Sequence, residues 1–204
     1  MDTGEPMAGS TDPRTAGNGS LMRLSPVVLL YASDPSDAIS FAAESSKTTH
    51  AALEAVDACR LFAALLLGAI YGEPKNTILS AQYCTVKNYW VTQPLSENIA
   101  NISNGNYKDK SRGEIRSTGY VVDSLEAALW SFHNSDSFEE GAILAVNLGG
   151  DADTIGAIYG QLAGAYYGEA SIPIKWMKKL AYFHVFYLFA DELVSFYSGK
   201  PIFK

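Results

Sequence analysis

Cysteine is scarce in this sequence, with only Cys59 and Cys84 among 204 residues. Both lie in apolar, helix-like stretches and neither belongs to a CxxC pair, which argues against a structural zinc site or a redox motif. We therefore expect reduced thiols and a cytoplasmic protein. The first twenty residues have no basic segment followed by an apolar one, so they do not resemble a signal peptide.

Long hydrophobic runs and an excess of positive charge are also missing. The longest apolar run, residues 61–71, is too short to cross a membrane, and we expect no membrane association. The formal net charge of −7 disfavours a nucleic-acid partner bound through a basic surface. An anionic ligand remains compatible with this charge, because backbone nests and helix N-termini act locally. The sequence contains no GxGxxG or Walker motif, and no Ser/His/Asp or Cys/His triad suggests itself.

Helical patterns dominate after a short opening segment. Residues 1–15 are rich in Gly, Pro, Ser and Thr, which predicts a flexible N-terminal tail followed by one helical domain, residues 16–204. Apolar periodicity, caps and breakers predict helices over residues 26–31, 35–44, 49–71, 76–88, 121–133, 138–147 and 151–167, with one shorter helix after residue 94 and two after residue 173. Residues 102–118 are polar and predict a lid or binding loop. Strand signals are weak, so the predicted fold class is all-α.

The segment NLGGDADTIGAIYGQLAGAYYG, residues 147–168, carries the most chemical information. Asp151, Asp153 and Thr154 fall on the first turn of a predicted helix, where two carboxylates and a hydroxyl can converge. These hard oxygen ligands suit Mg²⁺, Mn²⁺ or Ca²⁺. The alternative is helix capping, which is the more ordinary role of Asp at this position when the motif is considered alone.

Glycine recurs every four residues along the same helix, at Gly156, Gly160 and Gly164, before the closing Gly168. Each interior glycine costs about 1 kcal/mol relative to alanine, which calls for a compensating gain. We expect the backbone of another helix to approach this stripe. The helix would then form the buried centre of a bundle, with its acidic N-terminus at a cleft.

Two further features are candidates for ligand binding. Gly17, Asn18 and Gly19 can present successive backbone N–H groups to a phosphate, although a plain turn is the usual role of such a triplet. His50 precedes the long predicted helix, where a surface or capping role is the common alternative. His133 and His184 lie in helical patterns and are expected to be structural.

Four segments together resemble the ADP-ribosylglycohydrolase family. They are GNGSLMR, THAALEAVDACRLFAALLLGAIYG, GYVVDSLEAALWSF and NLGGDADTIGAIYGQLAGAYYG, and they occur in this order over residues 17–168. The resemblance implies an orthogonal all-α bundle with a two-metal centre, of Mg²⁺ or Mn²⁺, beside an ADP-ribose cleft. The implied activity is metal-dependent removal of ADP-ribose from a protein side chain, so the implied partner is ADP-ribose or an ADP-ribosylated protein.

The resemblance also implies roles for individual residues. Asp151, Asp153 and Thr154 would be metal ligands, and the two aspartates would be catalytic. The remaining implied positions bind substrate: Gly17, Asn18, Gly19 and Ser20 beside the ribose and phosphates, His50 on the diphosphate or ribose side, and Tyr120 near the adenine.

One segment of the family pattern has no counterpart here. The family carries an earlier Thr-Asp-Asp cluster that supplies further metal ligands, and Thr11-Asp12 followed by Pro13 is a poor match for it. The chain is therefore expected to be an N-terminally truncated form, covering the C-terminal two-thirds of the family domain. It would be a fragment, one half of a pair of chains, or inactive. The alternative functions are a non-catalytic ADP-ribose-binding module and a helical interaction domain.

Overall fold

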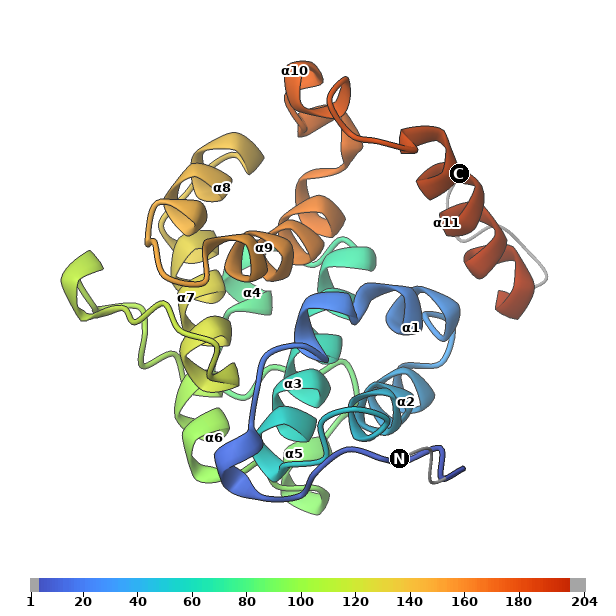
Figure 1. Cartoon of the computed structure of the whole chain (residues 1–204), viewed down its shortest axis with the longest axis vertical. Helices are drawn as coiled ribbons and strands as arrows, with labels where there is room; N and C mark the ends of the chain where they lie inside the picture. The colour runs from blue at the N-terminus through green and yellow to red at the C-terminus, as the bar shows by residue number, and fades with distance from the viewer. Residues whose placement is uncertain (1–3, 199–204) are drawn as a thin grey trace.

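The computed structural model describes residues 4–198, which form helices and loops and contain no strand (Figure 1). The all-α prediction is confirmed. The α-helices are α1 (Ser25–Leu30), α2 (Pro35–Lys47), α3 (Leu53–Ile70), α4 (Lys75–Ile78), α5 (Tyr89–Thr92), α6 (Glu97–Ser103), α7 (Val121–His133), α8 (Phe138–Val146), α9 (Ala152–Tyr167), α10 (Ile174–Met177) and α11 (Phe183–Ser198). Four 3-10 turns join them: η1 (Pro13–Thr15), η2 (Leu21–Arg23), η3 (Arg112–Glu114) and η4 (Glu169–Ser171).

Helix α3 lies at the centre of the molecule and contacts α1, α2, α6, α7 and α9. It is mostly apolar, and 14 of its 18 residues are buried, as expected for a helix that other helices surround. It begins at Leu53 rather than at the predicted residue 49. Residues 48–50 instead form a turn after α2, where His50 pairs with Ser10 and the Ala51 N–H donates to the Ser10 carbonyl at 3.1 Å.

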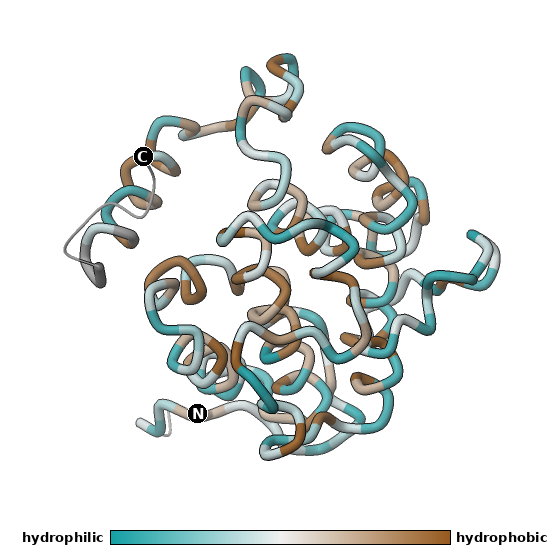
Figure 2. The backbone as a smooth tube through the Cα atoms, turned by 180° about the vertical axis from the view of Figure 1, so that it is seen from behind, coloured by the Kyte–Doolittle hydropathy of each residue, from teal (hydrophilic) through white to brown (hydrophobic). Residues whose placement is uncertain are grey.

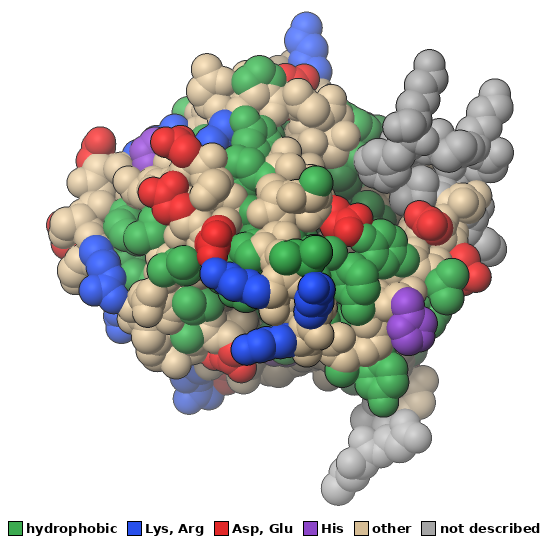
Figure 3. Space-filling view, turned by 90° about the horizontal axis from the view of Figure 1, so that it is seen from above, with side chains coloured by type: hydrophobic (Ala, Val, Ile, Leu, Met, Phe, Trp, Pro, Cys, Tyr) green, Lys and Arg blue, Asp and Glu red, His purple; other side chains and the backbone are tan. Residues whose placement is uncertain are grey.

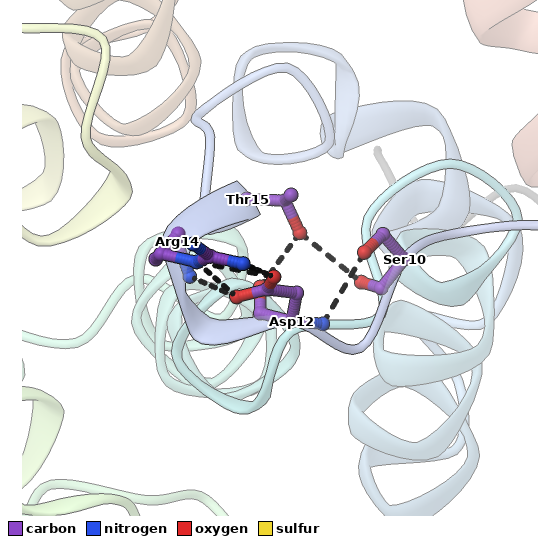
Figure 4. A network of polar contacts seen from close by, with 4 residues as sticks. All are labelled: Ser10, Asp12, Arg14 and Thr15. Carbon is purple, nitrogen blue, oxygen red and sulfur yellow. Dashed lines mark hydrogen bonds and ion pairs between the residues drawn. The ribbon is translucent and has the colours of Figure 1, made fainter.

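The N-terminal segment predicted as a flexible tail makes specific contacts where it is described. Ser10 pairs with His50, and the Gly9 N–H donates to the Lys47 carbonyl at 3.0 Å. The Asp12 carboxylate caps η1 and accepts hydrogen bonds from the Arg14 side chain, the shortest at 2.6 Å (Figure 4). These bonds, chiefly the side-chain ones from Arg14, lower the pKa of Asp12. The mobility of residues 1–15 stays a prediction.

The prediction of a helix over residues 76–88 is wrong. Only α4 forms, and the chain then runs as a loop to α6 with a short turn of helix at α5. Tertiary contacts hold this loop against α3: the Arg60 guanidinium donates to the Gln93 carbonyl at 2.7 Å and lies 5.5 Å from the centre of the Trp90 ring. The buried Asp57 carboxylate accepts from Arg60 and from the Ser96 N–H, each at 2.7 Å. A local helical pattern cannot include such long-range bonds.

Helix α9 buries one face rather than its whole surface. Its buried residues, Thr154, Ile155, Ile158, Tyr159, Leu162 and Ala163, face α3, α7 and α8. The glycine stripe lies on a half-exposed face instead. A Cβ added at Gly160 or Gly164 would have no heavy atom within 4 Å among the described residues. The predicted close approach of a second backbone is therefore wrong at both positions within this chain.

Helix α10 lies at the periphery of the molecule, and the chain then returns so that α11 contacts α1 (Figure 1). Along most of the inner helices hydrophobic and hydrophilic segments alternate, as expected for helices with one buried face (Figure 2). On the face drawn in Figure 3, lysine and arginine side chains are interspersed with aspartate and glutamate. No helix within residues 4–198 is both long and apolar enough to span a bilayer.

Candidate functional site

The loop that contains Gly17, Asn18 and Gly19 packs against the residues that precede α7. Gly17 and Tyr120 form an isolated antiparallel bridge, in which the Val121 N–H donates to the Ala16 carbonyl at 3.0 Å. The Asn18 N–H donates to the Gly119 carbonyl at 3.1 Å. Two segments about 100 residues apart in sequence thus form one surface of the candidate site.

The backbone nest predicted for this loop is only partly correct. The Gly17 N–H donates to the Thr15 carbonyl at 2.7 Å, and the Asn18 N–H is used by Gly119. Among the described residues, the N–H groups of Gly19 and Ser20 have no acceptor; Gly19 is half-buried, whereas Ser20 is fully buried. The three-donor arrangement at positions 17–19 is therefore wrong, because two of the donors already stabilise the loop itself.

The Asn18 side chain joins this loop to the start of α9. Its carboxamide donates to the Asp151 carboxylate at 2.6 Å and to the Ser124 hydroxyl at 2.8 Å. Ser124 in turn donates to the Thr118 carbonyl at 2.8 Å. Asn18 and Ser124 are buried, so these hydrogen bonds form with little competition from water and fix the orientation of the amide.

Asp151 occupies the N-cap position of α9, but its side chain makes no capping hydrogen bond. Capping therefore does not account for this carboxylate. Asp153 is exposed and accepts from the Thr154 N–H at 2.9 Å, which satisfies one free donor of the first turn. The Thr154 hydroxyl is largely buried, 3.8 Å from the Met22 sulfur. The two predicted carboxylate ligands and the hydroxyl thus lie on one helix turn.

A tight turn brings the chain into this position. Gly150 has φ +54°, and a Cβ there would lie 2.0 Å from the Ser117 carbonyl oxygen, so only glycine fits. Loop residues bind this turn directly: the Ser117 hydroxyl donates to the Gly149 carbonyl, and Arg112 donates to the Asn147 carbonyl. The predicted lid loop is therefore tied to the turn before Asp151.

His50 lies against the glycine loop, as the sequence predicted. A Cβ at Gly19 would lie 2.8 Å from its ring, and one at Gly17 would lie 3.2 Å from Nε2, so glycine permits this close packing. The ring Nδ1 is 2.8 Å from the Thr49 hydroxyl. Partial burial and the nearby Arg23 guanidinium lower the pKa of His50.

Ser20 differs from the other predicted substrate-binding residues, because its side chain faces the core. The hydroxyl is buried and accepts from the Ser46 hydroxyl at 2.9 Å, with the Cys59 sulfur 3.5 Å away. Burial raises the pKa of the Cys59 thiol to about 11. The Ser20 side chain is therefore not available to a ligand.

Tyr120 pairs with Gly17 through its backbone, and its side-chain hydroxyl is bound to Glu54. The hydroxyl donates to the Glu54 carboxylate at 2.6 Å, and the Asn98 carboxamide donates to the same carboxylate at 2.7 Å. Desolvation and then Glu54 raise the pKa of Tyr120 to about 12. This contact fixes the ring orientation.

Sequence reasoning did not single out Glu54, Asp123 or Ser124. Asp123 accepts from the Thr118 hydroxyl at 2.7 Å, which helps to hold the loop before Tyr120. A signal was present: Asp123 and Ser124 are adjacent polar residues on a helix whose other first-half positions are mostly apolar. A buried polar side chain needs a partner, so such a pair marks a contact with another segment.

The sequence and the fold are similar to those of known proteins. A family model described as ADP-ribosylglycohydrolase matches residues 2–201. The protein named ADP-ribosylarginine hydrolase Tri1 from Pseudomonas putida strain GB-1 is 42% identical over 185 residues, covering 91% of this chain and 47% of that protein. Its namesake from Serratia proteamaculans strain 568 is 37% identical and covers 84% of this chain and 44% of its own length.

Two further similarities agree with these. The ADP-ribosyl-[dinitrogen reductase] glycohydrolase of Rhodospirillum rubrum is 46% identical over 65 residues, which are 32% of this chain and 22% of that protein. A solved structure described as an ADP-ribosylglycohydrolase-related protein complex superposes with a TM-score of 0.83 at 41% identity, covering 95% of this chain and 64% of that chain. The chain spans about half the length of the hydrolases named Tri1 that it matches.

Proposed function

Because the chain belongs to the ADP-ribosylglycohydrolase family, we propose that it takes part in hydrolysis of the bond between ADP-ribose and a protein side chain. The two relatives named ADP-ribosylarginine hydrolase favour arginine as that side chain. The observation that carries the proposal is the 2.6 Å hydrogen bond between Asn18 and Asp151. It joins the loop proposed to bind substrate to the helix proposed to bind metal.

The donor set at the start of α9 fits part of a magnesium or manganese site. Both ions prefer oxygen ligands, and Asp151 has a carboxylate that is not spent on capping. When bound, such an ion would polarise a ribose oxygen and lower the pKa of a bound water. The chain's own contribution is orientation: Asn18 holds the Asp151 carboxylate, and Ser124 holds Asn18.

Substrate contacts would come from the glycine loop and its neighbours. The half-buried N–H group of Gly19 can donate to a phosphate oxygen, and the Arg23 guanidinium lies nearby, bound to the Thr49 hydroxyl at 2.8 Å. His50 presents Nε2 to the same loop. We propose that the ADP-ribose diphosphate lies here, and that the adenine lies near Tyr120.

The site needs more ligands than these. Two carboxylates and one hydroxyl leave much of a six-coordinate shell to water. The part of the chain that the structure describes contains no group of three or more His, Cys, Asp or Glu residues able to hold a metal ion. We propose that a further acidic segment, from the same or another polypeptide, completes the site. A non-catalytic ADP-ribose-binding module is the second candidate, favoured by the same incomplete ligand set.

Calorimetric titration with Mn²⁺ tests the metal assignment without relying on activity. We expect weak binding that Asp151→Ala and Asp153→Ala each abolish. Glu169→Gln is the matched control, because Glu169 is an exposed acid just beyond the other end of α9. Unchanged affinity in both aspartate variants would refute the assignment.

Thermal melting with ADP-ribose tests the substrate site separately. A ligand that binds only the folded state raises the melting temperature, and we expect Asn18→Ala and His50→Ala to reduce that shift. Release of ADP-ribose from modified arginine then distinguishes a hydrolase from a binding module. Binding without release, even after a polypeptide with a Thr-Asp-Asp segment is added, would favour the module.

A further inference from the structure

A cavity lies outside the candidate site, at the end of the bundle opposite to Asp151. It has a volume of about 520 Å³, which is within the range of small-molecule sites. Lys75, Lys108, His133 and Asp136 line it, with Leu79 and Tyr166 as apolar walls. His133 is the last residue of α7 and Val121 the first, so at 1.5 Å per residue they are roughly 18 Å apart. The cavity is therefore separate from the site around Asn18.

The two lysines that line the cavity are held by neutral groups. The Lys75 ammonium donates to the Ser135 carbonyl and to the Tyr167 hydroxyl at 3.4 Å. The Lys108 ammonium donates to the Leu79 carbonyl at 2.5 Å. Within residues 4–198, neither forms an ion pair with a carboxylate. Since an ammonium has three donors, one on Lys75 and two on Lys108 remain for a ligand.

Packing fixes where the two ammonium groups lie. Lys75 Nζ is 4.8 Å from the centre of the Phe132 ring, which favours a cation at that position. The Lys108 side chain crosses Gly105 so closely that a Cβ there would lie 2.9 Å from Lys108 Cε. Both lysines therefore present their charge to the cavity without a large loss of side-chain freedom on binding.

The pKa of His133 reflects its burial and the charges that surround this cavity. Burial is the main cause that lowers its pKa, and the charges of Lys108 and Lys75 lower it further, while Asp109 opposes them. Asp136 and Glu140 face Lys75 and raise its pKa, although burial lowers that pKa more. Even with these three acids nearby, the two lysine charges disfavour a proton on His133.

We propose that this cavity binds a small phosphate monoester, with the phosphate between Lys75 and Lys108 and the organic part against Leu79 and Tyr166. Lysine is a common phosphate ligand, acting as a point charge. A dianionic phosphate would replace the neutral carbonyls as the main partner of both ammonium groups. The inference does not depend on the function proposed for the site at Asp151.

Proton NMR of the histidine rings tests the proposal, with inorganic phosphate and phenyl phosphate as probes. The full chain has three histidines, so His50 serves as an internal reference for the other site. We expect both probes to raise the pKa of His133, and a separate rise at His50 would report binding at the diphosphate site proposed beside the glycine loop. Phenyl phosphate should bind more tightly, because its ring adds apolar contact with Tyr166.

Two variants keep the fold while removing the charge. Lys75→Gln and Lys108→Gln retain a donor for the Ser135 and Leu79 carbonyls, and each should weaken phosphate binding at least about tenfold. Lys179→Met, at an exposed lysine outside the cavity, is the control and should change nothing. Melting temperatures confirm folding. Equal affinity in both glutamine variants, a response at His50 instead of His133, or no response at millimolar phosphate would overturn the proposal.

Discussion

Helices α3 and α9 contact each other and are both rich in small residues, yet they serve different purposes. Helix α3 is buried on all sides, and its Gly68 accommodates the Tyr83 hydroxyl, which would lie 2.5 Å from a Cβ at that position. Helix α9 buries one face, leaves Gly160 and Gly164 open, and carries Asp151 and Asp153 at its start. Helix α3 therefore mainly stabilises the fold, whereas α9 also presents two carboxylates at its N-terminal end.

Removing a core aromatic from α3 should have the largest effect on stability. Phe62 is fully buried, so Phe62→Ala should lower the free energy of unfolding by about 3–5 kcal/mol. Phe186→Ala, at a residue of α11 that is 58% exposed, should cost less than about 1 kcal/mol. Urea denaturation of both variants measures the difference. Similar losses in the two would contradict the central role of α3.

Asn18→Ala probes the junction between the glycine loop and α9. It leaves the Ser124 hydroxyl and the Asp151 carboxylate without their shared donor, which should cost about 1–3 kcal/mol of stability. Asn18→Asp is the sharper variant, because it places a carboxylate against Asp151 and should cost more near neutral pH. Denaturation at several pH values would show the excess cost fall as the pH drops. A pH-independent cost would argue against direct contact with Asp151.

Glycine-to-alanine substitutions should have opposite effects on stability in the two helices. Gly68→Ala should destabilise the chain by about 1–3 kcal/mol, because the new methyl group overlaps Tyr83. Gly160→Ala should instead stabilise it by about 0.5–1 kcal/mol, because alanine is the better helix former and the position is open. Thermal melting measures both signs. A destabilising Gly160→Ala would mean that the stripe is covered in solution.

The smallest expected effect is the pH dependence that arises from His50. Its pKa in the folded chain lies below the ordinary value of 6.5, so the unfolded chain binds more protons between the two values. The stability contribution is complete above about pH 6.5 and is lost as the pH falls through the lower folded pKa. His50→Gln should flatten this part of the stability curve. An unchanged slope would show that His50 keeps its ordinary pKa.

Much of the fold was predictable from local patterns. Helix α7 has the predicted bounds, residues 121–133, because its apolar stripe and termini agree with its packing. The Ser137 cap forms, with the Ser137 hydroxyl accepting from the Glu140 N–H at 3.2 Å. The Glu140 side chain accepts from the Asp136 N–H, one residue before this cap. The loop after α4 was not predictable, since Arg60 and Asp57 hold it from a distant helix.

Local sequence patterns were enough to predict the all-α class, the acidic residues at the start of α9 and the segments that carry the family motifs. They could not determine that Asn18 bridges Ser124 and Asp151, that Ser20 faces the core, or that the glycine stripe is open. The physical reason is the distance along the sequence over which each feature is determined. Helix periodicity and capping depend on residues within about four positions, whereas these features depend on which segments the packed core brings into contact.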